Sequence, residues 1–411
     1  MRRVRRIFIG SEKIKEVLGR GVEKIYPSRE ELERLLMSGK KIRLYCGYDP
    51  TAPSLHIGHA ITLRKLSQFQ NLGHEVIMLL GDFTGMIGDP SDKTAARKRL
   101  TRKEVKENLK NYKKQASRIL NFSGPNKAKI LYNSRWNDKL RFAELIDLAS
   151  NFTVQQITIR DMFQERIKNN KPIYLHEFLY PLTQAYDSVA MDVDLEIGGN
   201  DQTFNMLCGR DLMKILKNKE KFVLTTKLLK DPTGKKMGKT EGNMINLDEE
   251  SSEMYGKIMS WPDSLIIPGF ELCTDISISE IKNIKNQINH NSMNPRDAKA
   301  KLAFEIVKIH HGEMIAKKAQ QEFDRIFKEK KEPSEMSIYK LIEPINILTL
   351  LFEKGLVVSK GEAKRLIKQG AVEENGRVIN NYYELISPKT KEDGGTIIRV
   401  GSRKFIKLIK K

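Results

Sequence analysis

Short apolar runs alternate with longer helical patterns through the first 230 residues of the chain. The runs that have the length of buried strands are Ile42–Tyr48, Val76–Leu80, Ile130–Tyr132 and Leu195–Ile197. Helical periodicity is found in Ile61–Leu72, in Lys103–Leu120 and in a stretch that begins at Asp201. Strands that alternate with helices are typical of a parallel sheet covered by helices. The pattern therefore predicts an α/β fold with a Rossmann-like, parallel-sheet domain.

The strand signals fade after about residue 245, and this change divides the chain into parts. We expect a first domain over 1–244, interrupted by a mainly helical insertion at about 138–191, and a helical domain over 245–330. In the helical domain, Asn294-Pro295 is a typical helix start, because Asn caps a helix and Pro fits its first position. The stretch 331–344 is expected to be a solvated linker, and 345–411 a small, basic α+β domain.

Basic residues outnumber acidic ones by a wide margin. The 411 residues include 73 Lys and Arg against 52 Asp and Glu, a formal charge of +21. General solubility would explain this charge, but a polyanion whose phosphates attract Lys and Arg is favoured, and nucleic acid is the foremost candidate. No apolar stretch approaches the roughly 18 residues that span a bilayer. The basic N-terminus is followed by too short an apolar run for a signal peptide. We therefore expect a cytoplasmic protein with no membrane partner.

A structural metal is not predicted. Cys46, Cys208 and Cys273 are far apart in the sequence and fit no zinc-ligand spacing. The seven histidines include no H-x-x-x-H pair.

Two histidines flank a glycine where the first predicted strand gives way to a helix. The segment is His56-Ile57-Gly58-His59. Imidazole donors and backbone N–H groups at a helix N-terminus form a natural anion site, and the carboxyl edge of a parallel sheet is where nucleotides bind. Neither G-x-G-x-x-G nor G-x-x-x-x-G-K-[ST] follows the strand. Other residues must therefore bind the phosphates.

A cluster of glycines and lysines lies at the end of the predicted first domain. It runs from residue 231 to 243, and its glycines allow a close approach of the backbone to a ligand. Lys236 and Lys239 could close over a triphosphate and stabilise charge as pyrophosphate leaves. Alone, such a loop is more typical of a solvated surface turn. Together with the histidine segment, it predicts a site that activates ATP.

The histidine and lysine segments resemble the two signatures of class I aminoacyl-tRNA synthetases. Their context resembles the bacterial tyrosyl-tRNA synthetases in four further segments, at residues 45–50, 85–90, 184–187 and 197–202. The resemblance covers essentially the whole chain, and the motifs occur in the family's order. One departure lies in the lysine segment, where Gly238 and Thr240 stand in place of the serines of the general class I pattern.

The resemblance implies an ATP site in which no side chain acts as a covalent nucleophile. The carboxylate of the amino acid attacks the α-phosphate, and the protein supplies position and charge stabilisation. The catalytic residues that it implies are Thr51, His56, His59, Lys236, Lys239 and Thr240. The ATP-binding residues that it implies are Gly47, Asp49, Gly58, Gly199, Asp201 and Lys239. ATP is a substrate that brings Mg²⁺ with it, and the sequence contains no dedicated carboxylate cage for the metal.

The resemblance also implies L-tyrosine as the amino acid. Tyr45 and Asp187 would hydrogen-bond its phenolic hydroxyl, which a phenylalanine would lack. The residues that it assigns to the α-ammonium and carboxylate ends are Asp89, Tyr180, Gln184 and Gln202. Alone, the tyrosines would more often be core residues and Asp89 a turn residue. Asp187 is harder to explain as a structural residue, because burying an unpaired carboxylate is costly.

Residues from about 345 resemble the S-four-type RNA-binding module. Ser359 is expected to cap a helix whose inward residues are Ala363, Leu366 and Ile367. Basic groups suited to phosphates follow at helical spacing, namely Lys360, Lys364, Arg365 and Lys368. A solvated basic helix is the alternative. The family further implies that 245–330 recognises the anticodon, that the partner is tRNA(Tyr), and that the protein is a homodimer.

Three rival hypotheses remain. A tryptophan-specific relative would share the core fold, but Tyr45, Asp187 and the basic tail argue against it. A nucleotidylyltransferase that uses no tRNA would need neither the second domain nor the tail. A catalytically silent RNA-binding relative would not need the histidine and lysine signatures. The leading hypothesis is an enzyme that activates L-tyrosine with ATP and transfers it to tRNA(Tyr).

Overall fold

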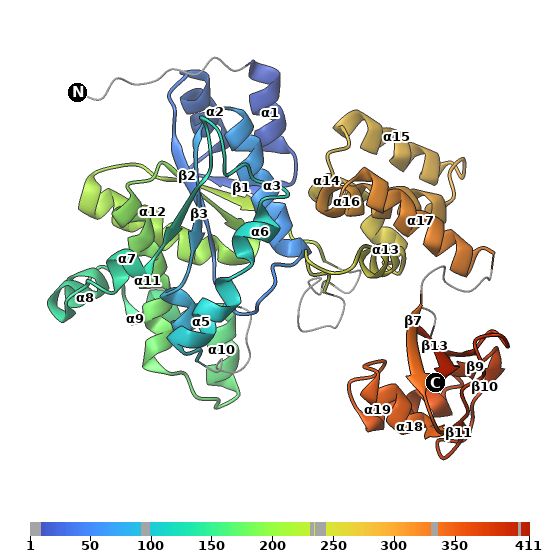
Figure 1. Cartoon of the computed structure of the whole chain (residues 1–411). Helices are drawn as coiled ribbons and strands as arrows, with labels where there is room; N and C mark the ends of the chain where they lie inside the picture. The colour runs from blue at the N-terminus through green and yellow to red at the C-terminus, as the bar shows by residue number, and fades with distance from the viewer. Residues whose placement is uncertain (1–9, 92–98, 231–233, 235–243, 330–335, 402–403) are drawn as a thin grey trace. The chain divides into compact units, whose positions relative to one another are not determined.

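A six-stranded sheet forms the centre of the N-terminal part of the chain (Figure 1). The computed structural model describes residues 10–91, 99–230, 234, 244–329, 336–401 and 404–411. In spatial order, the strands are β1 (Val22–Tyr26), β6 (Phe222–Thr226), β5 (Leu195–Gly199), β2 (Arg43–Tyr48), β3 (Glu75–Leu80) and β4 (Lys129–Tyr132). The strands from β6 to β4 pair in parallel, and β1 pairs with β6 in antiparallel orientation. The predicted α/β fold is confirmed.

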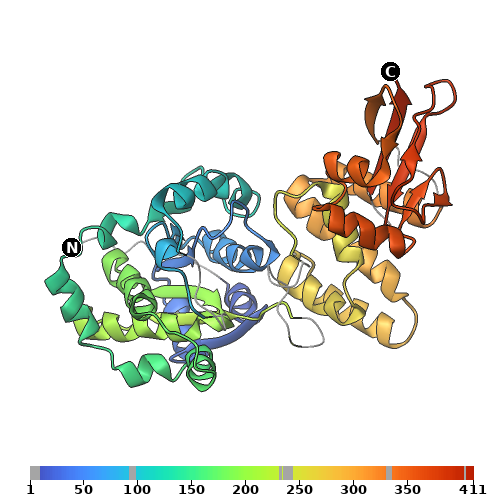
Figure 2. The same cartoon turned by 90° about the horizontal axis from the view of Figure 1, so that it is seen from below.

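The order of the strands reverses direction between β2 and β5. Helix α3 (Ile57–Asn71) connects β2 to β3, whereas α12 (Thr203–Lys217) connects β5 to β6 on the other side of the switch. Because such crossovers are right-handed, the two connections place their helices on opposite faces of the sheet, and helices lie on both sides of it in Figures 1 and 2. A ligand site is expected at the carboxyl ends of β2 and β5, where the directions diverge.

Both faces of the central strands are buried. Leu44, Tyr45, Cys46 and Tyr48 of β2 are all buried, and so are the last five residues of β3. A parallel strand that helices cover on both faces has apolar residues without strict alternation. This explains why these strands appear in the sequence as short apolar runs.

Two groups of helices extend the sheet domain. The N-terminal helices are α1 (Ser11–Gly19) and α2 (Arg29–Met37), and α4 (Thr84–Ile87), α5 (Arg102–Leu109) and α6 (Tyr112–Ala116) follow β3. The stretch between β4 and β5 is helical and contains α7 (Ser134–Asn137), α8 (Phe142–Ala149), α9 (Val154–Thr158), α10 (Asp161–Lys168) and α11 (Leu175–Met191). The single helix predicted over Lys103–Leu120 is wrong. It is divided at Lys110 and Asn111, and Asn is a weaker helix former than the Lys, Glu and Leu residues before it.

A helical segment follows the sheet. It consists of α13 (Ser251–Met259), α14 (Ile266–Cys273), α15 (Ile278–Asn289), α16 (Pro295–His311) and α17 (Glu313–Phe327), with short 3₁₀ turns at Asp263–Leu265 and, earlier in the chain, at Asn200–Gln202. The predicted start of α16 is confirmed, because Asn294 accepts a hydrogen bond from the N–H of Arg296 and Pro295 is the first helical residue.

Basic side chains from the sheet domain hold the C-terminal end of α14. The Arg20 guanidinium donates to the carbonyl oxygens of Phe270, Glu271, Thr274 and Ile276 at 2.6–3.0 Å. Arg64 of α3 donates to the Thr274 carbonyl and to Asp275. A helix end has unpaired carbonyls and a partial negative charge, so guanidinium groups stabilise it. The helical segment is therefore bonded to α3 and to the chain before β1.

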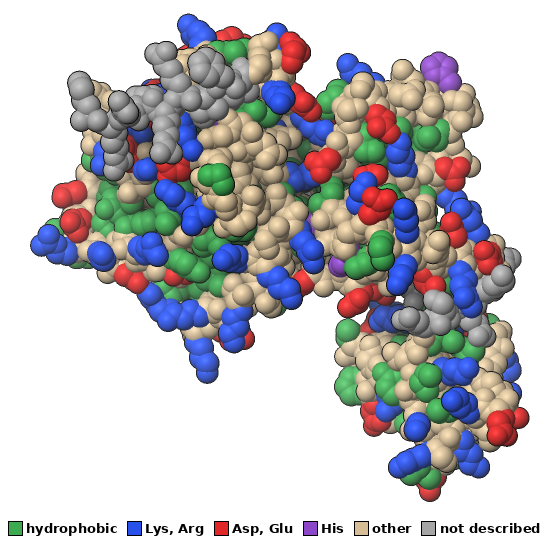
Figure 3. Space-filling model, turned by 45° about the horizontal axis from the view of Figure 1, so that its top comes forward, with side chains coloured by type: hydrophobic (Ala, Val, Ile, Leu, Met, Phe, Trp, Pro, Cys, Tyr) green, Lys and Arg blue, Asp and Glu red, His purple; other side chains and the backbone are tan. Residues whose placement is uncertain are grey.

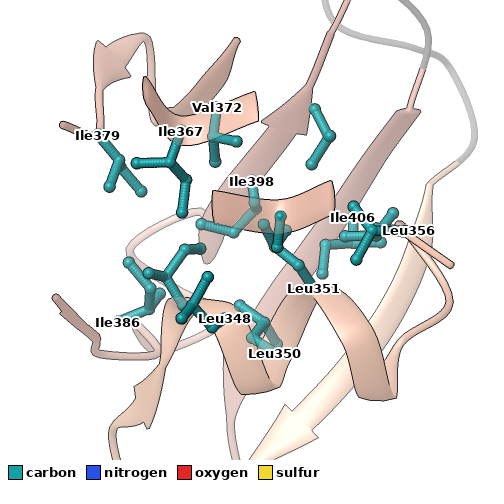
Figure 4. Packing of buried hydrophobic residues seen from close by; sticks show 14 of the residues in the cluster. Leu348, Leu350, Leu351, Leu356, Ile367, Val372, Ile379, Ile386, Ile398 and Ile406 are labelled. Atoms are coloured by element: carbon teal, nitrogen blue, oxygen red, sulfur yellow. The ribbon is translucent and has the colours of Figure 1, made fainter. Parts of the chain in front are cut away.

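The chain divides into two compact units, Met1–Ala316 and Lys317–Lys411. The second unit contains a sheet in the order β10 (Arg377–Val378), β9 (Val372–Glu374), β12 (Thr396–Val400), β13 (Lys404–Lys410) and β7 (Ser337–Leu341). It also contains the pair β8 (Ile345–Asn346) and β11 (Leu385–Ile386), and the helices α18 (Ile347–Glu353) and α19 (Lys360–Lys368). Its core packs the helices onto the sheet through Leu351, Ile367, Ile398 and Ile406 (Figure 4).

Two of the predicted boundaries need correction. Ser337–Leu341 lies in the stretch predicted as a linker, 331–344, but it pairs in parallel with β13 along five residues. No residue of β7 is fully buried, because β7 is an edge strand, and its sequence therefore resembles that of a linker. The predicted boundary between 244 and 245 does not separate compact units, since both sides belong to the first unit.

Candidate active site

The two histidines of the first signature form the N-terminal cap of α3. His56 Nδ1 accepts from the N–H of Gly58 at 3.1 Å, and His59 Nδ1 accepts from the N–H of His56 at 3.1 Å. The rings stack with centroids 3.8 Å apart. Burial and the adjacent His56 hold the pKa of His59 well below its usual value. A neutral imidazole that accepts at Nδ1 carries its proton on Nε2, so each ring is a donor at that atom.

Glycines keep space around this cap and at the carboxyl ends of β2 and β5. A Cβ on Gly58 would lie 2.9 Å from the His56 ring, so a side chain there would displace the histidine. A Cβ on Gly199, the last residue of β5, would lie 2.4 Å from the Asp201 carboxylate. Gly47 of β2 is exposed, and a Cβ there would meet no described atom within 4 Å. The predicted ATP-binding glycines therefore line the switch point of the sheet.

The chain on both sides of the lysine segment is anchored at this site. β6 ends with Thr226 opposite Gly199, and the N–H of Ile57 donates to the Ile245 carbonyl at 2.9 Å. Leu247 in turn donates its N–H to the Leu55 carbonyl at 2.8 Å. The predicted residues Lys236, Lys239 and Thr240 lie outside the described residues.

Predicted ATP and tyrosine residues contact one another. The Tyr180 hydroxyl donates to Asp49 Oδ2 at 2.8 Å, and Thr84 donates to Asp49 Oδ1 at 2.6 Å. Gln202 Nε2 donates to Asp89 Oδ2 at 2.7 Å. Thr51 lies two residues after Asp49, and its N–H donates to the Asp49 carbonyl at 2.8 Å. The two predicted subsites are therefore contiguous at the carboxyl edge of the sheet.

Three of the predicted tyrosine ligands come from one face of α11. Tyr180, Gln184 and Asp187 follow helical spacing. Asp187 is only 2% exposed and accepts from Trp136 Nε1 at 2.7 Å, from Asn137 at 3.2 Å and from Asn133 at 3.2 Å.

Asp187 is therefore a paired carboxylate, and the cost of burying an unpaired one does not apply to it. Burial raises the pKa of this carboxyl to about 8, although the three donors act in the opposite direction. An ionised carboxylate has about four acceptor positions. One position remains for a further donor.

A buried polar network lies beneath the predicted tyrosine ligands. The Tyr45 hydroxyl bonds to Ser188 Oγ at 2.9 Å, and Lys221 Nζ donates to Ser188 Oγ at 2.8 Å and to Glu196. Burial raises the pKa of Tyr45 well above its usual value, and the Glu196 and Asp187 carboxylates add to the effect. Among the described residues, the Tyr45 hydroxyl bonds to Ser188 and not to Asp187.

Sequence reasoning missed the partners of these ligands. They are Thr84, Asn133, Trp136, Asn137, Ser188, Glu196 and Lys221. Lys221 has no distinguishing signal in the sequence, because it ends the charged run Lys217-Asn218-Lys219-Glu220-Lys221 that directly precedes β6.

The described residues contain no cluster of three His, Cys, Asp or Glu side chains that could hold a metal ion. Cys46, Cys208 and Cys273 are buried and free. In the part of the chain that the structure describes, no helix has both the length and the apolar character needed to cross a bilayer.

The predicted basic helix of the second unit is α19. Ser359 caps it by accepting from the N–H of Glu362 at 3.1 Å, while Ala363 and Ile367 are buried and Leu366 is half-buried. The exposed side chains include Lys360, Lys364, Arg365 and Lys368. Lys364 Nζ lies 5.3 Å from the centre of the Tyr382 ring. The basic groups therefore face away from the core of the unit.

A parallel sheet with this switch point and a histidine-capped helix beside it is typical of nucleotide-binding α/β proteins. The model of the family "tRNA synthetases class I (W and Y)" matches residues 37–328, and the model of the S4 domain matches residues 346–390. The chain belongs to this family of class I tRNA synthetases.

Named relatives are similar over almost their whole length. The tyrosine--tRNA ligase of Thermotoga maritima is 43% identical over 394 residues, which are 96% of each chain. That of Carboxydothermus hydrogenoformans is 45% identical over 404 residues, or 96% of this chain and 97% of the other.

A solved structure of a truncated mitochondrial tyrosyl-tRNA synthetase from Aspergillus nidulans has a TM-score of 0.65 at 24% identity, and covers 77% of this chain and 94% of its own. At that identity the comparison supports the fold alone.

Proposed function

We propose that the protein is a tyrosine--tRNA ligase: it joins L-tyrosine to ATP as tyrosyl-adenylate with release of pyrophosphate, then transfers tyrosine to the 3′ end of tRNA(Tyr). The relatives named above support this proposal. The observation that carries it is the contact between the two sets of predicted ligands, in which the hydroxyl of Tyr180, from the tyrosine set, is bonded to Asp49, from the ATP set. ATP and an amino acid bound by these sets would meet at one point.

The first step needs position and charge stabilisation. A tyrosine carboxylate oxygen forms a bond to the α-phosphorus of ATP, and the bond from that phosphorus to the β-phosphate oxygen breaks. The N-terminal end of α3 and the Nε2 donors of His56 and His59 would stabilise the charge on the phosphates. Lys236, Lys239 and Thr240 would stabilise the leaving pyrophosphate. Mg²⁺ would enter on the ATP phosphates, since carboxylate ligands for it are not clustered among the described residues.

The tyrosine subsite would distinguish the phenol from a phenyl ring. Asp187 retains one acceptor position beyond its three donors, and the Tyr45 hydroxyl lies in the same buried region. A phenylalanine would leave that buried carboxylate position unpaired, which is costly. At the other end, Asp89, Tyr180, Gln184 and Gln202 would bind the ammonium and carboxylate groups.

The second unit would bind tRNA. The exposed cations of α19 have a spacing suited to RNA phosphates. The helical segment over 245–330 would recognise the anticodon. The cytoplasm, where charged tRNA is used, is the compartment that this proposal implies.

A homodimer is supported by exposed apolar side chains on the helices between β4 and β5. Phe142 and Leu175 are each 78% exposed, and Ile159 is 71% exposed. Hydrophobic side chains gather on this flank of the first unit in Figure 3. Large exposed apolar patches mark interaction surfaces. Replacing Phe142 and Leu175 with Glu should convert a dimer into a monomer in sedimentation equilibrium; a wild-type monomer would refute this part of the proposal.

The decisive assay is amino-acid-dependent ATP–pyrophosphate exchange with each of the twenty amino acids. We expect exchange with tyrosine. Exchange with tryptophan instead would favour the tryptophan-specific relative. The absence of exchange with any amino acid would favour the catalytically silent alternative.

A further inference from the structure

A buried ion pair lies directly behind Gln184. Lys221 is 0% exposed and Glu196 2% exposed, and the two are hydrogen-bonded. Lys221 Nζ also donates to Ser188 Oγ at 2.8 Å and to the Met206 carbonyl at 3.1 Å, so all three of its protons have acceptors. Gly209 of α12 makes room for the pair, because a Cβ there would lie 2.6 Å from Lys221 Nζ.

The other oxygen of this carboxylate determines how the Gln184 amide is oriented. Glu196 Oε1 accepts from Gln184 Nε2 at 3.1 Å. A carboxylate paired with an ammonium group only accepts hydrogen bonds, so Gln184 must present its NH₂ group to it. The Gln184 carbonyl oxygen then faces away from Glu196.

That carbonyl oxygen is buried and has no partner among the described residues. Leaving a buried acceptor unpaired costs free energy, and such atoms in native proteins often mark a binding function. The missing partner has to be a hydrogen-bond donor, and the α-ammonium group of an amino acid is one.

We propose that Lys221 and Glu196 are positioning residues of the amino-acid subsite, which hold Gln184 with its carbonyl oxygen ready to accept a hydrogen bond from the substrate ammonium group. This inference rests on the proposed function. It adds two residues that do not touch the substrate. It also explains why a lysine is buried directly before β6.

The amide geometry predicts an unusual effect of Glu196→Gln. Lys221 can only donate, so the new amide turns its oxygen toward Lys221 and its NH₂ group toward Gln184. Gln184 must then accept with its own oxygen, and its NH₂ group faces the substrate ammonium. Two donors would oppose each other, and kcat/KM for tyrosine should fall roughly 10- to 150-fold, the range of a lost hydrogen bond to a charged group.

The double variant Glu196→Gln/Lys221→Met should reverse this loss. Without the lysine, the amide oxygen at 196 is free to accept from Gln184 again. A merely structural role predicts the opposite, because a second substitution in the same buried cluster would add to the damage.

The experiment measures ATP–pyrophosphate exchange against both substrates. We expect Glu196→Gln to weaken tyrosine use while the KM for ATP is unchanged, and the double variant to recover most of the loss. Inhibition by 3-(4-hydroxyphenyl)propionate, which lacks the ammonium group, should be unaltered in both. Glu177→Gln is a matched control, since it breaks the buried pair with Arg166 at 2.7 Å without contact to Gln184.

The inference is overturned if the double variant is no better than the single one, or if binding of the deaminated inhibitor weakens equally. If Glu196→Gln does not fold, the double variant Glu196→Gln/Lys221→Met is compared with Glu196→Met/Lys221→Met. Both replace the ion pair with neutral residues, but only the first keeps an oxygen at position 196 that can accept from Gln184. The Met/Met protein should then have the higher KM for tyrosine, and equal values would refute the inference. Failure of the wild-type protein to exchange with tyrosine refutes the proposed function instead.

Discussion

Asp187→Asn tests whether the buried carboxylate on α11 recognises a phenol. The change conserves shape and removes the charge. The asparagine oxygen can still accept from Trp136 and Asn137, which are 2.7 Å and 3.2 Å from Oδ1. Its NH₂ group would face Asn133, which donates to Oδ2 at 3.2 Å in the wild type. Most of the local bonding is therefore retained, whereas alanine would leave all three donors unpaired.

The expected loss comes from the fourth acceptor position of the carboxylate. Above about pH 8, where Asp187 is ionised, a hydrogen bond to this charged group contributes about 1.5–3 kcal/mol. Its loss in the transition state corresponds to a decrease of roughly 10- to 150-fold in kcat/KM for tyrosine. Phenylalanine lacks the hydroxyl, so its weak activation should not change, and discrimination between the two amino acids should fall by the same factor.

The pKa of Asp187 adds a pH signature. Burial raises this pKa to about 8, so the empty site holds a protonated carboxyl below that pH and a carboxylate above it. Since only the carboxylate accepts freely, the wild-type kcat/KM for tyrosine should increase as the pH rises through about 8. The asparagine variant should lack this increase.

These quantities are measured by ATP–pyrophosphate exchange in which the concentrations of tyrosine, phenylalanine and ATP are varied in turn. Thermal unfolding checks that the variant is folded. An unchanged kcat/KM for tyrosine would refute the reasoning, and so would an equal rise in the KM for ATP. If the two proteins had identical pH profiles, the proposed role of Asp187 ionisation would be refuted, whereas its role as a hydrogen-bond acceptor would stand.

Three other perturbations have definite outcomes. Gly58→Ala places a methyl group 2.9 Å from the His56 ring, so the KM for ATP should rise about tenfold or more while tyrosine binding, measured by equilibrium dialysis without ATP, is retained. Removing 336–411 deletes the sheet and the helices α18 and α19 of the second unit and leaves α17 whole, so exchange should persist and tRNA charging should weaken; equal charging would refute the role of that unit. Burial lowers the pKa of His74 to about 4 and of His310 to about 3. The unfolded chain therefore binds more protons below about pH 6.5, and each histidine should reduce the free energy of unfolding by about 1.4 kcal/mol per pH unit as the pH falls toward 4, as denaturant titrations would reveal.

The parallel sheet could be predicted from the sequence because its central strands are buried on both faces. Runs such as Val76–Leu80 have no polar residue to interrupt them, and β3 extends that run by one residue only. The strand β1 was missed, since its exposed Glu23 and Lys24 hide the apolar pattern at the sheet edge. β7 was missed for the same reason.

The ligands of the candidate site could be predicted from the sequence, but the residues that hydrogen-bond to those ligands could not. The histidine cap follows from local sequence, because the two bonds by which the His56 and His59 rings cap the helix lie within four residues. Glu196 and Lys221 are separated by 25 residues and meet only when β5 and β6 pair. Sequence patterns report local geometry, while such a pair depends on the register of neighbouring strands.

The bonds between Arg20, Arg64 and the end of α14 affect how freely parts of this protein can be exchanged. A chimera joined near residue 245 would import a foreign α14 beneath two guanidinium groups that now satisfy its last carbonyls. If the imported helix did not match, buried guanidinium donors on one side of the junction and helix carbonyls on the other would lose their hydrogen-bond partners. The helical segment is therefore not a unit that can be exchanged by itself, because Arg20 and Arg64 of the sheet domain bond to it, and recombination would be tolerated better after α17.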